Sequence, residues 1–249
     1  MTPPRPMTPP RPTEEPRPTE EPRPTGPSHP ATEPPPRPTA SAGPIRPAVS
    51  GIVLAGGRSR RFGGDKLGAL VDGRPLLQRS VEAVGGVCRE VLIVLAPDAP
   101  EPDLPAGLAV PLRFVRDPEP FGGPLVGIAA ALAQASEPVA LVVGGDMPWL
   151  AGEVLALLVR ELEASGSGLA ALVSGERVEQ LPIAVRVATV RPAAERLVGA
   201  GERRLTALRR EIETRLVDEA TWRRLDPDGR SLRDVDRPSD LADGYHGRP

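Results

Sequence analysis

One glycine-rich run constrains the fold of this chain more than any other feature. It reads Leu54-Ala-Gly-Gly-Arg-Ser-Arg-Arg-Phe-Gly-Gly-Asp-Lys66 and ends on the only lysine among 31 basic residues. Residues 51–54, just before the glycines, read as a buried strand, and residues 75–84 read as a helix with proline in its first turn. The sequence therefore predicts a glycine loop that leaves the end of a strand.

The composition of this loop suits a polyphosphate. Its glycines permit positive φ angles and let backbone N–H groups come close to anionic oxygens. Its positive charges are Arg58, Arg60, Arg61 and Lys66. Arginine fills every other basic position of the chain, so the single ammonium group suggests a compact point charge that a guanidinium group cannot replace. This density of features favours a nucleoside triphosphate over a solvated connecting turn.

The loop is neither a standard P-loop nor a dinucleotide-binding fingerprint. It has no Gly-x-x-x-x-Gly-Lys-Ser/Thr, since Asp65 precedes the lysine, and no Gly-x-Gly-x-x-Gly. Its pattern instead resembles the signature of the MobA-like nucleotidyltransferases, whose best-known members are the molybdenum cofactor guanylyltransferases. Three later stretches are similar to that family in order and spacing: Asp117-Pro-Glu-Pro-Phe-Gly-Gly-Pro-Leu-Val-Gly127, Val142-Val-Gly-Gly-Asp-Met-Pro148 and Asp234-Val-Asp-Arg-Pro-Ser-Asp-Leu241.

The resemblance implies a GTP site that works with Mg²⁺. Asp146 follows the apolar residues 139–143, so its carboxylate is expected at the edge of a sheet, where one or two carboxylates suffice for Mg²⁺. An aspartate that only satisfies a turn is the alternative. The family pattern assigns catalysis to Arg61, Lys66 and Asp146, metal binding to Asp146, and nucleotide contacts to Leu54, Ala55, Gly56, Gly57, Lys66, Asp117 and Asp146.

Other segments resemble the family in part or depart from it. Asp117 could be an ordinary turn starter before proline, whereas the matching family residue contacts the guanine nucleotide. Asp234 and Asp236 stand where guanylyltransferases usually carry Asn-x-Asn. Either residue could supply a second metal carboxylate or shift the acceptor preference away from the pterin. Residues 176–182 and 201–205 resemble the family's acceptor side, or are an ordinary turn and helix start.

Strand and helix patterns alternate along residues 49–243. This alternation predicts an α/β fold with three layers, Rossmann-like, in which a mostly parallel central sheet carries helices on both faces and binds ligands at the carboxyl ends of its strands. The expected strands are residues 51–54, 91–96, 112–115, 139–143, 169–173 and 182–187. The expected helices are residues 75–84, 125–133, 153–163 and 203–212.

The ends of the chain differ in composition from this domain. Residues 1–48 contain a hexapeptide repeat rich in proline, threonine and charge, so we expect a disordered tail with polyproline II character. A neutral spacer is favoured over a ligand for a proline-recognising partner. Residues 244–249 are expected to be a flexible carboxyl terminus.

Composition also excludes several classes of function. The net charge of −2 and the aromatic content of 2% argue against nucleic-acid binding. The sequence shows neither a membrane span nor the apolar core of a secretory signal, so a cytoplasmic protein is expected. The single Cys88 is expected to pack rather than react. His29 and His246 lie outside the predicted domain, which leaves catalysis to carboxylates, lysine and arginine.

The predicted activity is transfer of GMP from GTP to the phosphate of molybdenum-bearing molybdopterin, with release of pyrophosphate. Molybdoenzymes or their chaperones would be further partners. A cytidylyltransferase or another transferase with a different phosphate acceptor is one alternative, although the pair Gly56 and Gly57 resembles the guanylyl branch. A non-catalytic nucleotide-binding regulator is the other, and the joint presence of Lys66, Asp117 and Asp146 argues against it.

Overall fold

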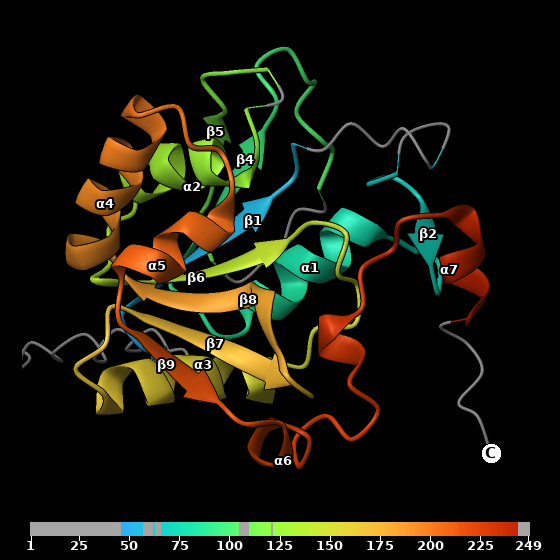
Figure 1. Ribbon diagram of the computed structural model, residues 1–249. Helices are drawn as coiled ribbons and strands as arrows, with labels where there is room; N and C mark the ends of the chain where they lie inside the picture. The colour runs from blue at the N-terminus through green and yellow to red at the C-terminus, as the bar shows by residue number, and fades with distance from the viewer. Residues whose placement is uncertain (1–45, 57–61, 63–65, 105–109, 121, 244–249) are drawn as a thin grey trace, which may run out of the picture. The chain divides into compact units, whose positions relative to one another are not determined.

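The computed structural model describes residues 46–56, 62, 66–104, 110–120 and 122–243. Its centre is a sheet of seven strands (Figure 1). Their spatial order is β5 (Leu112–Arg116), β4 (Glu90–Leu95), β1 (Val49–Leu54), β6 (Val139–Gly144), β8 (Arg177–Arg186), β7 (Leu169–Ser174) and β9 (Thr214–Val217). A separate hairpin joins β2 (Leu70–Val71) to β3 (Arg74–Pro75).

Most strand pairs in the sheet are parallel. β5, β4, β1 and β6 run in one direction, and β9 runs parallel to β7. β8 is antiparallel to both of its neighbours, β6 and β7. β4 and β6 are buried along their whole length, as expected for parallel strands with both faces covered, whose sequences read as continuous apolar runs. The predicted mostly parallel α/β sheet is confirmed.

Helices cover both faces of this sheet (Figure 1). Val53 of β1 joins the core cluster that contains α1 and α3, whereas Ile52, its neighbour, joins the cluster that contains α2, α4 and α5. Successive side chains of a strand point to opposite faces, so two cores and three layers result. The helices are α1 (Leu76–Gly85), α2 (Pro124–Leu132), α3 (Gly152–Ala164), α4 (Val187–Gly199) and α5 (Leu208–Glu211).

A third, smaller cluster attaches the carboxyl-terminal segment to the sheet edge. Val235 is fully buried and packs with Val71 of β2 and Leu76 of α1. This packing brings residues near the end of the chain to the edge where β6 ends. The short elements of this part of the chain are η1 (Leu205–Ala207), α6 (Glu219–Trp222), η2 (Arg230–Leu232) and α7 (Pro238–Asp243).

Two predicted elements differ from the structure. The helix expected over residues 203–212 begins only at η1, because Arg204 has an extended backbone. The strand expected over residues 182–187 starts earlier, at Arg177, and α4 was not predicted. Cys88 is buried, and loss of hydration raises the pKa of its thiol to about 12, which agrees with a packing role. In the described part of the chain, every helix is too short or too polar to cross a membrane.

Candidate functional site

The loops after β1, β5 and β6 all leave the sheet at its carboxyl edge. The carbonyl of Leu54 accepts a hydrogen bond from Gly145 N (2.9 Å), and Asp117 N donates to the carbonyl of Leu95 (2.8 Å). Ala55 N donates in the same way to a carbonyl of β4. These bonds continue the strand pairing past the strand ends, so they hold Ala55, Asp117 and Gly145 at one edge.

Three successive carbonyl groups fix the turn that carries Asp146. The oxygen of Asp146 accepts from Val235 N (3.0 Å), that of Met147 from Ser80 Oγ (3.1 Å), and that of Pro148 from Arg79 Nε (3.2 Å). Two of these donors belong to α1 and the third to the carboxyl-terminal segment. The turn is therefore held from two sides, independently of any ligand.

The position of the Asp146 carboxylate requires glycine at residue 144. A Cβ atom on Gly144 would lie 2.5 Å from Asp146 Oδ1 and 3.2 Å from Met147 Cγ. Either contact is closer than ordinary van der Waals distance, so any larger residue would displace the carboxylate. Because Gly144 has no side chain, the carboxylate of Asp146 can lie over the end of β6.

Lys66 reaches this carboxylate from the glycine-rich loop. Its Nζ donates to Asp146 Oδ2 (2.8 Å) and to Asp236 Oδ1 (3.0 Å), while the lysine side chain is only 10% exposed. Burial by itself would lower the pKa of Lys66, but the hydrogen bonds and negative charges of the two aspartates outweigh it and raise the pKa. The lysine is therefore firmly protonated.

Three carboxylates gather around this ammonium group. Asp146, Asp234 and Asp236 each offer an oxygen atom, and the three oxygens lie within 4.8 Å of one another. Desolvation, together with the negative charges of Asp146 and Asp236, raises the pKa of Asp234. Carboxylate oxygens are the protein ligands that Mg²⁺ prefers, so the chemistry of this donor set fits that ion.

Asp117 lies on the other side of β1, against α2. Its Oδ1 accepts a hydrogen bond from Glu119 N (3.0 Å), and burial raises the pKa of its carboxyl group. A Cβ atom on Gly127 would lie 3.7 Å from Asp117 Oδ2, 3.8 Å from Leu54 Cδ2 and 2.9 Å from Val94 Cγ1. Glycine in the second turn of α2 thus lets the helix approach β4 and brings Leu54 and Asp117 to one place.

The predicted site residues are therefore brought together in part. Leu54, Ala55, Gly56, Lys66, Asp117 and Asp146 are all at the carboxyl edge or in the loops that leave it, whereas Gly57 and Arg61 lie outside the described residues. Gly56 does not take a positive φ, and a Cβ atom there would meet only ordinary contacts, the nearest at 3.5 Å. The conformational freedom expected at Gly56 is not used in this structure.

The sequence did not predict the residues of α1 that hydrogen-bond to the turn carrying Asp146. Arg79 and Ser80 sit in a predicted amphipathic helix, where a polar residue normally faces water. Ser80 is nevertheless fully buried, and the sequence offered only its place beside Val81 on the apolar side of the helix as a signal. Asp234 and Asp236 were recognised as carboxylates of interest, but their meeting with Lys66 was not.

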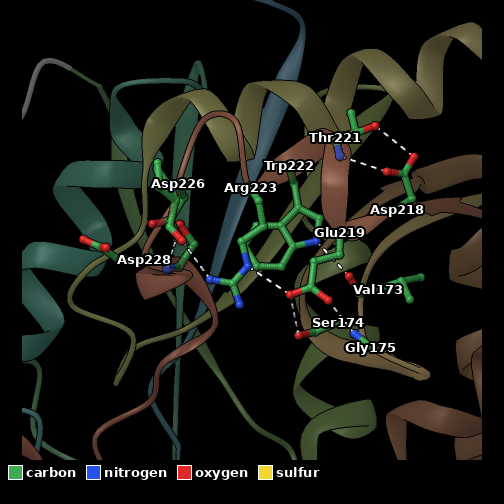
Figure 2. Close-up of polar contacts among 12 residues, drawn as sticks. Val173, Ser174, Gly175, Asp218, Glu219, Thr221, Trp222, Arg223, Asp226 and Asp228 are labelled. Carbon is green, nitrogen blue, oxygen red and sulfur yellow. Dashed lines mark hydrogen bonds and ion pairs between the residues drawn. The ribbon is translucent and has the colours of Figure 1, made fainter. Parts of the chain in front are cut away.

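The hairpin between β7 and β8 projects at the same edge. Because Val142 pairs with Ile183 in antiparallel register, the residues before Ile183 run past the carboxyl end of β6. Figure 2 shows how α6 holds the turn of this hairpin: Glu219 accepts from Gly175 N (2.6 Å), and the buried Trp222 donates through Nε1 to a carbonyl of β7 (2.8 Å). Residues 176–182, which resemble the family's acceptor side, are thus mostly part of β8, and α6 fixes the turn that precedes them.

The sequence of this chain is similar to a known family and to curated proteins. The MobA-like NTP transferase domain family matches residues 51–216. A probable molybdenum cofactor guanylyltransferase from Chloroflexus aggregans is 34% identical over 201 residues, which covers 80% of this chain and 94% of the relative. A protein of the same name from Methanothermobacter thermautotrophicus is 33% identical, covering 76% and 95% respectively.

A solved structure agrees at the level of the fold. The crystal structure of molybdopterin-guanine dinucleotide biosynthesis protein A from Archaeoglobus fulgidus superposes with a TM-score of 0.64 at 22% identity, and the match covers 78% of this chain and 95% of that one. The family match includes Lys66, Asp117 and Asp146, whereas Asp234 and Asp236 lie beyond its end. On the family match and the identity to these relatives, the chain belongs to the MobA-like NTP transferases, a family of nucleotidyltransferases.

Proposed function

We propose that this protein is a Mg²⁺-dependent guanylyltransferase that transfers GMP from GTP to the terminal phosphate of molybdenum-bearing molybdopterin. The observation that carries the proposal is the cluster of Lys66 with Asp146 and Asp236 at the carboxyl edge of the sheet, where the Asp117 loop also lies, with β4 and β1 between β5 and β6. The names of the relatives support guanine as the base and the molybdenum cofactor as the acceptor.

The proposed residue roles follow the geometry of the edge. The nucleotide lies along the loops after β1, β5 and β6, in contact with Leu54, Ala55, Gly56, Gly57, Lys66, Asp117 and Asp146. Asp146 would hold Mg²⁺, and the neighbouring carboxylates of Asp234 and Asp236 would add negative charge that strengthens the attraction for the ion. Bound there, the ion would supply positive charge that offsets part of the negative charge of the phosphates.

The reaction needs alignment and charge neutralisation more than a base. An oxygen of the acceptor phosphate attacks the α-phosphorus of GTP, and the bond from that phosphorus to the bridging oxygen breaks. Pyrophosphate then leaves with the electron pair. The acceptor is already an anion, so no proton must be removed and no covalent enzyme intermediate is needed. Lys66 and Arg61 stabilise charge that builds on the α-phosphoryl and departing oxygens.

A nucleotide panel tests the proposal. The full chain is incubated with molybdopterin, Mg²⁺ and one of GTP, CTP, ATP or UTP, and released pyrophosphate is measured. We expect release with GTP and loss of that release when molybdopterin or Mg²⁺ is omitted. Preference for CTP would favour the cytidylyltransferase alternative instead. Nucleotide binding without turnover under every condition would favour the regulator, and Asp146→Asn serves as the inactive control.

A further inference from the structure

The side chain of Arg203 joins two segments that are 84 residues apart. Its Nε donates to Glu119 Oε2 and its second terminal nitrogen to Glu119 Oε1, both at 3.0 Å. The remaining terminal nitrogen donates to the carbonyls of Val198 and Glu202, each at 3.0 Å. Every nitrogen of this guanidinium group therefore has a partner, and the two-bond fork fixes the direction of the glutamate.

Backbone contacts reinforce the same junction. The carbonyl of Arg203 accepts a hydrogen bond from Leu125 N (3.3 Å) in the first turn of α2. Gly123 has a φ of 89°, and a Cβ atom there would lie 2.8 Å from the Arg203 carbonyl oxygen. The turn after α4 and the loop that enters α2 are thus in contact over both their main chains and their side chains.

The junction continues to the carboxylate of Asp117. Glu119, whose side chain Arg203 holds, donates its own N–H to Asp117 Oδ1. A shift of the main chain at Glu119, once its side chain is released from Arg203, would move this donor. The neighbouring Arg204 differs, because its side chain is 73% exposed and donates to Glu202, two residues earlier in the chain. The two successive arginines therefore have different environments, and only the first reaches the Asp117 loop.

We infer that Arg203 is a positioning residue for the nucleotide: through its fork on Glu119 it sets the orientation of the Asp117 carboxylate. The inference rests on the proposed function, because it takes Asp117 as a nucleotide contact. Nucleotide affinity then depends on a side chain that lies outside the loops at the strand ends. The ion pair itself adds little to global stability, since its two side chains are 34% and 43% exposed.

The inference therefore predicts that removing the ion pair lowers nucleotide affinity but leaves global stability nearly unchanged, and both quantities can be measured. GTP is titrated calorimetrically, with Mg²⁺ and without acceptor, into the full-length wild type, Arg203→Lys, Glu119→Gln and the double variant. Arg196→Lys is the matched control, because Arg196 forms a similar exposed pair with Glu211 between α4 and α5, away from the Asp117 loop. Melting temperatures are measured in parallel, and KM and kcat are compared with saturating acceptor.

Both single variants are expected to weaken GTP binding about 10-fold, which corresponds to one coupling of about 1.4 kcal/mol. The double variant should be no weaker than either single variant, since both remove the same contact. KM for GTP should rise more than kcat falls, and melting temperatures should stay close to that of Arg196→Lys.

Three results would overturn the inference, and they are distinguishable. If the wild type binds GTP and the variants bind it as tightly as Arg196→Lys does, Arg203 is only a structural brace and the proposed function stands. If the wild type binds no nucleoside triphosphate, the proposed function fails and the inference fails with it. Lower affinity accompanied by an equal loss of stability in both single variants would also contradict a positioning role.

Discussion

The ammonium group of Lys66 lies between two carboxylates, those of Asp146 and Asp236. It lies 2.8 Å from Asp146 and 3.0 Å from Asp236 in a largely buried position. We expect Lys66→Ala to lower kcat by about 100-fold or more, because charge stabilisation of the transition state is lost. Lys66→Arg should also be poor, since a planar guanidinium group does not fit the place of a compact ammonium group.

Steady-state pyrophosphate release from the purified variants measures this effect. Circular dichroism and the melting temperature show whether each variant is folded. Near-normal turnover in a folded Lys66→Ala protein would rule out a catalytic role for the lysine. Its contacts with the two aspartates would then be structural only.

Asp146→Asn separates the charge of the carboxylate from its shape. The amide oxygen of asparagine can still accept from Lys66 Nζ, and the carbonyl bond from Val235 N is unaffected. The melting temperature should therefore change little, whereas the Mg²⁺-dependent part of the GTP affinity should fall and turnover should nearly stop. Calorimetric titration of GTP with and without Mg²⁺ measures both parts. An unchanged Mg²⁺-dependent part would move the metal site to Asp234 or Asp236.

Among the elements, the amino-terminal edge of the sheet depends on one ionised glutamate. Glu90 in β4 accepts hydrogen bonds from Ser50 Oγ (2.6 Å), Ser136 N (2.7 Å) and Arg113 (2.6 Å), so that it ties β1, β4 and β5 to the loop before β6. Burial would raise the pKa of Glu90, but these hydrogen bonds and the charge of Arg113 outweigh it and lower the pKa.

This lowered pKa predicts how stability depends on pH. Because the folded-state pKa is below the unfolded-state value, the contribution of Glu90 is complete above the unfolded-state pKa and is lost as the pH falls through the folded-state pKa. In urea unfolding, Glu90→Gln should be less stable than the wild type at pH 7, and the gap should narrow below about pH 4. A gap that stays constant between about pH 7 and pH 3 would contradict this assignment.

The apolar strands could be predicted closely from the sequence, because burial on both faces leaves an unambiguous pattern. The strand expected over residues 139–143 is β6 (Val139–Gly144), and the loop after it carries Asp146 as expected. The first half of β8 was missed. Its residues 177–181 are mostly polar and lead into a proline, a pattern typical of a turn, whereas in the structure they are held by pairing with β7 and by hydrogen bonds from Arg209 to the carbonyls of Val178 and Glu179.

The late start of the helix at residues 203–212 has a long-range cause. Arg203 uses its side chain for Glu119 and its carbonyl for Leu125 N, so the chain stays extended until Leu205. Local propensity contains no information on partners in a distant loop. The same reason explains why Asp236 could be noted as an unusual carboxylate but not placed beside Lys66, which is 170 positions away.

For the whole chain, the composition of the amino-terminal repeats predicts that they contribute nothing to catalysis. Removal of residues 1–43 should leave both the melting temperature and kcat within error of the full-length protein, because a segment with few apolar side chains has little surface to bury. Differential scanning calorimetry and the pyrophosphate assay check this. A loss of several degrees in the truncated protein would show that the repeats dock on the domain.

The fate of the α-phosphorus of GTP tests the central claim most directly. GTP labelled at that phosphorus is incubated with the full-length protein, Mg²⁺ and molybdenum-bearing molybdopterin, and the products are separated. The account predicts that label moves into a guanine dinucleotide of the pterin, with one pyrophosphate released for each label transferred, and that Asp146→Asn transfers none. Label that remains in GTP, while CTP labelled in the same position is transferred, would contradict it.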